Sequence, residues 1–190
     1  MINNKFAQKA IEKGADGIVA VAAGAGGHAG IKSPFALIQE IRQWFDGPVA
    51  LSGSIATGGA VLAAQAMGAD FAYIGTAFIA TEEARASDAY KQAIVEGTSD
   101  DIVYSSLFTG VHGNYLAPSI VNAGMDPANL PEGDVKTMSF SGGEGSKAKA
   151  WKDIWGSGQG IGAISEVSSA GVFIEKLKRE YQEARQRLAL

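Results

Sequence analysis

Short apolar runs alternate with helical patterns along the first 80 residues. A run of small and β-branched residues at 17–23 is typical of a strand buried on both faces, the run at 48–52 repeats this pattern, and a third strand is predicted at 71–75. Before and between them, apolar positions recur at helical spacing over 4–13, 34–45 and 58–69. Ser33 and Pro34 fit the cap and the first residue of the second helix. This alternation with short connections predicts an α/β fold built on a parallel sheet.

The pattern changes after residue 80. Helices are predicted over 87–97 and 171–187, whereas 125–146 is polar and loop-like. The last helix is amphipathic, and its expected core contacts are Val172, Ile174, Leu177 and Tyr181. We therefore predict two parts: β/α units that carry the site loops at 1–80, and a helical and loop region at 81–190.

Composition and charge argue against several functions. With 190 residues, 46% of them hydrophobic, the chain is long enough to bury one sizeable core. A net charge of −4 without a basic block argues against nucleic-acid binding, which needs clustered Lys and Arg. No stretch reaches the ~18 apolar residues of a membrane span, and no signal-peptide core is present, so we expect a cytoplasmic protein. The chain has no Cys and no His-x-x-x-His or Glu-x-x-His pair, so no metal site is expected.

Loops of glycine and other small residues follow all three predicted strands. They are GAGGHAG at 24–30, SGSIATGG at 52–59 and GTAF at 75–78. In parallel β/α folds the carboxyl ends of the strands share one edge, where ligands bind. Residues 47–80 contain no Lys or Arg, so a phosphate bound there would be held by backbone N–H groups and helix N-termini.

His28 is the candidate for proton transfer. It lies in the first glycine loop, which we expect to be free to bring the imidazole near a bound molecule, and the ordinary His pKa of ~6.5 suits a general acid or base. His112, in TGVHGN, is less well placed. A competing interpretation is a dinucleotide site, because Gly24, Gly26 and Ala29 satisfy G-x-G-x-x-A. The next predicted helix begins later than that motif requires.

Four segments in order carry a resemblance to a known family. They are AGAGGHAG, PVALSGSIATGGAVLAAQAMGADFAYIGTAFIAT, TGVHGNYLAPSI and GSGQGIGAI. This set resembles the later half of the nitronate monooxygenase family, also called 2-nitropropane dioxygenase-like proteins. The resemblance implies a TIM (β/α)8 barrel that binds FMN and uses O₂ to oxidise an alkyl nitronate to a carbonyl compound and nitrite.

The resemblance also implies roles for particular residues. The family's catalytic histidine falls on His28, with Gly26 and Gly27 beside the flavin. The remaining cofactor-binding positions, which lie around the phosphate, fall on Gly53, Ser54, Tyr73, Ile74, Gly75 and Thr76. Ser54 stands where the family has glycine, and it would still offer its backbone N–H if its φ were negative.

Two positions of this chain depart from the family's pattern and keep other activities open. Many members carry a glutamine and a glutamate where this chain has Val21 and Gly24. An NAD(P)H-dependent flavin reductase of quinones or enoyl thioesters is therefore an alternative. A non-catalytic truncated or split-barrel fragment is another.

The chain is expected to be an incomplete barrel. Its three strands correspond to about strands six to eight of the family, followed by C-terminal helices, so it looks like the C-terminal part of a TIM (β/α)8 barrel. The strands at 17–22 and 71–75 should then expose unpaired edges, which need another chain to cover them. The expected partner is a missing N-terminal half or a second copy, and we expect the chain alone to bind FMN weakly or not at all.

Overall fold

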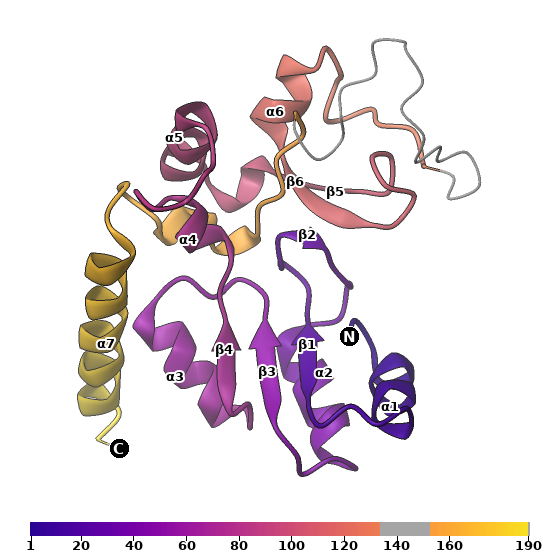
Figure 1. Cartoon of the computed structure of the whole chain (residues 1–190), viewed down its shortest axis with the longest axis vertical. Helices are drawn as coiled ribbons and strands as arrows, with labels where there is room; N and C mark the ends of the chain where they lie inside the picture. Colours follow the sequence, from indigo (N-terminus) through magenta and orange to yellow (C-terminus); the bar gives the residue numbers. More distant parts are fainter. Residues whose placement is uncertain (134–152, 190) are drawn as a thin grey trace.

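A parallel three-stranded sheet forms one half of the structure. The computed structural model describes residues 1–133 and 153–189, and much of the predicted loop at 125–146 lies outside them. The parallel strands lie in the order β1 (Ile18–Val21), β3 (Val49–Ser52) and β4 (Phe71–Tyr73) (Figure 1). The predicted parallel sheet is therefore confirmed, although each strand is shorter than its apolar run.

Three helices cover one face of this sheet. They are α1 (Asn4–Glu12), α2 (Pro34–Arg42) and α3 (Gly58–Ala66). Alternate strand residues pack against these helices in a core that includes Ile18, Ala20, Val49, Leu51, Leu37, Ile38 and Ile41. Because one face of the sheet is buried in this way, the register is fixed, and Ala20 lies beside Leu51.

The opposite face of the sheet is open. Val19, Phe71 and Tyr73 are 40%, 62% and 58% exposed, and the burial along β1 alternates. The prediction of strands buried on both faces is therefore wrong for the part of the chain that the structure describes. Apolar side chains on that face indicate a surface suited to packing.

The outer edge of β1 is partly paired. The Val21 N–H donates to the Met1 carbonyl at 2.9 Å, and the Met1 amino group donates to the Val19 carbonyl. These two bonds place Met1 beside β1 as a one-residue parallel bridge, so the expected fully open edge is not observed. Burial lowers the pKa of the Met1 amino group. Within the described ranges, β4 has a strand partner only on its β3 side.

A second, antiparallel sheet lies above the carboxyl ends of the first (Figure 1). Its order is β2 (Gly27–His28), β6 (Gly113–Leu116) and β5 (Ile102–Ser105). The segments around it are α4 (Thr76–Ile79), α5 (Asp88–Glu96), η1 (Ser99–Asp101), α6 (Ala117–Asn122) and η3 (Gln159–Ala163). This sheet joins residues 1–80 to residues 81–190, and the division at residue 80 stays a prediction.

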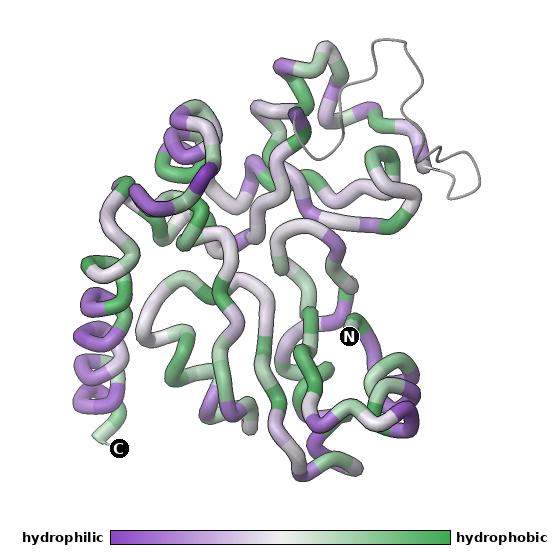
Figure 2. Tube along the Cα trace, in the orientation of Figure 1, coloured by the Kyte–Doolittle hydropathy of each residue, from purple (hydrophilic) through white to green (hydrophobic). Residues whose placement is uncertain are grey.

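The last helix, α7 (Ala170–Arg187), is present where the pattern predicts it. Phe173 is buried and Leu177 packs beside it, whereas Val172 and Ile174 are 57% and 40% exposed. The prediction that Val172 and Ile174 make core contacts is wrong, because each lies about 100° around the helix from Phe173. Figure 2 shows the hydrophilic residues that dominate this helix. No helix in the described ranges is both long and apolar enough to cross a membrane.

Close backbone contact joins α3 to α7. A Cβ on Gly58 would lie 2.1 Å from the Leu177 carbonyl oxygen and 2.3 Å from the Tyr181 nitrogen. The Gly58 N–H donates to the Glu180 carboxylate at 2.8 Å, so this acid caps the start of α3. The start of α7 is capped in the same way by Glu83, whose oxygens lie 2.9 and 3.1 Å from the Ala170 nitrogen.

Gly58→Ala is expected to separate α3 from α7. The added methyl group overlaps backbone atoms that cannot rotate away, so the free energy of unfolding should fall by about 1–3 kcal/mol or more. Gly59→Ala is the matched control, because its nearest neighbour, the Ala184 Cβ, is 3.8 Å away. Urea unfolding followed by circular dichroism measures both. Equal stability of the two variants would contradict the close contact.

Candidate functional site

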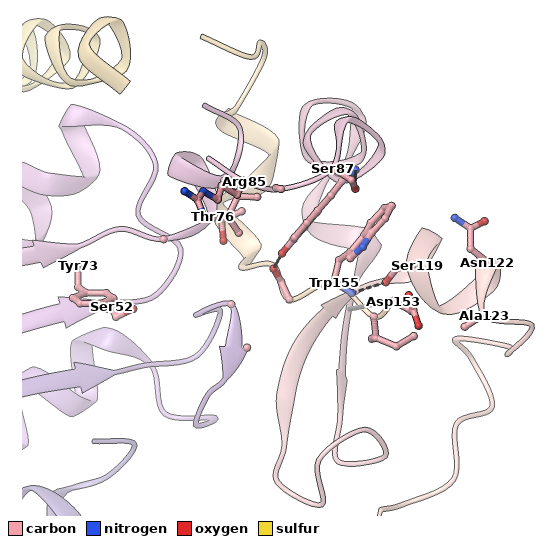
Figure 3. Close-up of a pocket in the computed structure, with 18 residues that line it drawn as sticks. Ser52, Tyr73, Thr76, Arg85, Ser87, Ser119, Asn122, Ala123, Asp153 and Trp155 are labelled. Atoms are coloured by element: carbon pink, nitrogen blue, oxygen red, sulfur yellow. Dashed lines mark hydrogen bonds between the residues drawn. The ribbon is translucent and has the colours of Figure 1, made fainter. Parts of the chain in front are cut away.

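A cleft of about 1090 Å³ lies where the two sheets meet. One wall comes from the ends of β3 and β4 and from the glycine loops, namely Ser52, Tyr73, Gly26, Gly27, Gly75 and Thr76. The other wall comes from α5, α6 and 153–156, as Figure 3 shows for Tyr73 at one end and Asn122 at the other. A cleft of this size, mostly apolar with a few polar groups, is typical of a cofactor or substrate site.

A small hollow of about 30 Å³ adjoins the cleft at the strand ends. It is lined by four segments, through Gly24, Gly53, Ser54, Gly75, Thr76, Gly158 and Gly160 among others, and no Lys or Arg lines it. The GSGQGIG segment at 156–162, which follows none of the three predicted strands, also lines this hollow. In the fold, the Gly158 N–H donates to the Thr76 hydroxyl at 2.9 Å, so this segment closes the hollow.

Some of the backbone N–H groups near this hollow already donate hydrogen bonds within the protein. The Gly58 N–H at the start of α3 already donates to Glu180 and the Ala60 N–H to the Thr57 hydroxyl, so these two groups of the expected helix N-terminus are not free for a phosphate. Ser54 has a φ of +56°, and its N–H donates to the Gly24 carbonyl at 3.3 Å. The negative φ under which this serine would offer its N–H to an anion is therefore not observed.

Glycines leave room for a ligand at two positions. A Cβ built on Gly27 or on Gly75 meets no atom within 4 Å, and both residues line the cleft. A side chain at either position would extend into space that is now open. This open space fits a bound group that approaches the backbone closely.

His28 lies beside the cleft but does not line it. It belongs to β2, and its Nε2 is 2.7 Å from the Thr109 hydroxyl oxygen. The loop that carries it is fixed, because the Asn114 side chain donates to the Ala25 carbonyl and the Tyr104 hydroxyl to the Ala29 carbonyl. The expectation of a freely moving loop is therefore wrong, since pairing with β6 turns part of it into a strand.

Two further residues singled out in the sequence lie away from both cavities. Ile74 packs in the core with Phe78 and Phe173 and lines neither cavity. His112 stacks on Tyr104 with ring centroids 5.0 Å apart. Among the described residues, no group of three acidic, His or Cys side chains is placed to hold a metal ion.

The middle of the cleft is aromatic. Tyr90 and Trp155 stack with ring centroids 5.0 Å apart and planes 13° apart, and the Tyr90 hydroxyl donates to the Gly156 carbonyl. Burial raises the pKa of Tyr90 to about 12. Arg85 is the one cation among the described lining residues. The sequence gives no signal for this wall, because its residues come from segments far apart.

A parallel β/α sheet with glycine loops and a cleft at its carboxyl edge is typical of α/β proteins that bind a ligand at the strand ends. Comparison with known proteins identifies its family. The nitronate monooxygenase family model matches residues 3–180, so the chain belongs to that family. It is 28% identical over 189 residues to a nitronate monooxygenase of Paraburkholderia phytofirmans, covering 92% of this chain and 51% of the relative.

Solved structures share the fold. A nitroalkane oxidase from Streptomyces ansochromogenes aligns with a TM-score of 0.76 and 26% identity over 99% of this chain and 58% of the other. FabK from Thermotoga maritima aligns with a TM-score of 0.75 and 23% identity, covering 100% and 61%. The chain spans about half the length of the curated relative and about 60% of these solved chains.

The raised pKa of Tyr90 predicts a loss of stability at high pH. The folded state keeps this proton up to about pH 12 while the unfolded state releases it near ~10, so stability falls as the pH rises from 10 towards 12. Between pH 8 and 11, wild type should lose about 1 kcal/mol more than Tyr90→Phe. Urea unfolding at both pH values measures this. Equal losses in the two proteins would contradict the burial of the phenol.

Ser54→Gly should stabilise the fold. A left-handed backbone costs a residue with a Cβ about 1–2 kcal/mol, and the gain is reduced by the greater freedom of glycine when unfolded, which leaves about 0.5–1 kcal/mol. Ser52→Gly is the control, because Ser52 lies in β3 and should lose stability. Thermal unfolding compares the two. A destabilised Ser54→Gly protein would show that this serine side chain is needed.

Proposed function

We propose that this chain forms the FMN-binding and proton-transfer part of an oxidoreductase of the nitronate monooxygenase family. The observation that carries the proposal is the meeting of three glycine loops in one cation-free hollow that opens into the cleft. The hollow would receive the FMN phosphate, through Gly53, Gly75 and Thr76. The open space beside Gly27 and Gly75 leaves room for the rest of the cofactor.

The proposed reaction is the oxidation of an alkyl nitronate by O₂ to a carbonyl compound and nitrite. FMN, when bound, would supply the electron transfer between the nitronate and O₂. His28, next to the cleft-lining Gly27, would orient or deprotonate the substrate. Arg85 adds a positive charge to the lining of the cleft, which suits an anionic ligand.

A flavin reductase that uses NAD(P)H to reduce quinones or enoyl thioesters is the second candidate. It is favoured by Val21 and Gly24, which place no polar side chain where many family members carry glutamine and glutamate. Reduction of the bound flavin by NADPH in the absence of nitronate would support this candidate. Reduction by nitronate alone would support the first.

The open sheet face supports a further proposal about the fold. Val19, Phe71 and Tyr73 would be covered by additional β/α units, so that β1, β3 and β4 act as about strands six to eight of a TIM barrel. The two hydrogen bonds of Met1 to Val19 and Val21 support the proposal, because they follow the pattern of a parallel strand beside β1. The covering units could belong to a separate chain or to a longer polypeptide. Without them, the chain would be a non-catalytic fragment.

FMN retention tests these proposals together. The purified chain is mixed with FMN and desalted, alone or with the amino-terminal half of a family relative, and the visible flavin absorption is recorded. We expect retention only in the mixture, because the open sheet face leaves the site incomplete. Stoichiometric retention by the chain alone would contradict the need for more strands. Loss from both samples would contradict the proposed cofactor site.

Gly75→Val sharpens this test. Its side chain would extend into the open hollow and should weaken FMN binding by at least about tenfold without changing the circular dichroism spectrum. Gly162→Val is the matched control, because Gly162 lies outside both cavities and the nearest atom to its built Cβ is 3.9 Å away. Equal FMN affinity of the two variants would place the phosphate elsewhere.

A further inference from the structure

The stacked rings of Tyr90 and Trp155 form a fixed surface on one wall of the cleft. The Trp155 backbone is held on both sides, because its N–H donates to the Ser119 hydroxyl at 3.0 Å and its carbonyl accepts from the Leu116 N–H at 2.8 Å. The Tyr90 hydroxyl donates to the Gly156 carbonyl, so the second ring is held as well. A ligand that packs on this pair would therefore lose little free energy to ordering the wall.

The lining of the cleft carries little charge. Tyr90 and Trp155 line it and stay partly exposed, and the apolar Ile154 lines it too. Among the described lining residues, only Arg85 and Asp153 are charged. Aromatic side chains attract a planar ring through offset or edge-to-face packing and through the burial of apolar area. The ligand feature that best matches this wall is therefore a planar aromatic ring.

This wall lies apart from the place proposed for the FMN phosphate. Neither Tyr90 nor Trp155 lines the hollow at the strand ends. Figure 3 shows Trp155 beside Ser119 of α6, with Tyr73 of β4 on the other side of the cleft. The cleft measures about 1090 Å³, whereas a site for one ligand commonly measures ~300–1,000 Å³. It therefore has room for a second molecule beside the cofactor.

We propose that this wall binds an aromatic ring of the substrate, so that the preferred nitronates carry an aryl group instead of a short alkyl chain. The inference rests on the proposed function and names the substrate class of the same cleft. The charged nitronate group would lie on the side of Gly27 and His28, while the ring packs on Tyr90 and Trp155. Arg85, the one cation of the described lining, suits the negative charge of such a substrate.

Two unreactive carboxylates test the ring site without flavin. Phenylacetate and propionate imitate an aryl and an alkyl nitronate, because each is a small planar anion and they differ only in carrying a phenyl or a methyl group. Calorimetry on the whole chain should show phenylacetate binding at least about tenfold more tightly than propionate. Trp155→Leu should remove most of this preference with an unchanged circular dichroism spectrum, whereas Trp155→Phe, which keeps a ring, should retain most of it.

Tyr181→Leu is the matched control, because it removes a ring that lines neither cavity, and it should keep the preference for phenylacetate. Equal affinity of wild type for the two probes, or an unchanged preference in Trp155→Leu, would overturn the inference.

Flavin-loaded protein separates this inference from the proposed function. In the mixture with the amino-terminal half of a relative, Trp155→Leu should lower kcat/KM about tenfold for the nitronate of phenylnitromethane and less than about twofold for that of nitroethane. Its FMN affinity should stay within about twofold of wild type. A loss of FMN affinity as large as that of phenylacetate would assign the wall to the flavin ring and overturn the inference. If the preference for phenylacetate holds but neither nitronate is oxidised, the ring site stands and the proposed reaction fails.

Discussion

The pairing of β2 with β6 is the interaction on which the site depends. Only two residue pairs form it, Gly27 with Asn114 and His28 with Gly113, yet they connect the first glycine loop to the far half of the chain. The buried Asn114 side chain adds a bond to Ala25 at 2.7 Å, in a place with little access to water. Together these bonds turn a stretch rich in glycine, which has high entropy when unfolded, into one wall of the cleft.

Glycine serves different purposes in different parts of this fold. At Gly58 it allows two helices to touch backbone to backbone, and at Gly158 it lets one loop lie within reach of the Gly24 carbonyl. A Cβ built on Gly75 has no atom within 4 Å, so the absence of a side chain at this position leaves open space. The first two positions are therefore constrained by packing, whereas the third is constrained by what the cleft has to hold.

Local patterns in the sequence predicted the β/α units well, because each strand and helix carries its own apolar spacing. The second sheet was not predicted, since β2 is two residues long and its stability comes from a partner about 85 positions away. The predicted core contacts at the start of α7 were wrong by one residue, because Val172 and Ile174 flank the buried Phe173 and all three are apolar. The φ of Ser54 and the contact between His28 and Thr109 depend on distant parts of the chain, which no local pattern encodes.

The Met1 bridge affects how polypeptide can be joined to this chain. Its ammonium group is partly desolvated at the edge of β1, where a charge is costly. An amide N–H would donate the same hydrogen bond to Val19 without carrying that charge. A residue fused ahead of Met1 would therefore keep this hydrogen bond without the charge, whereas an affinity tag fused after α7 would leave the sheet edge untouched.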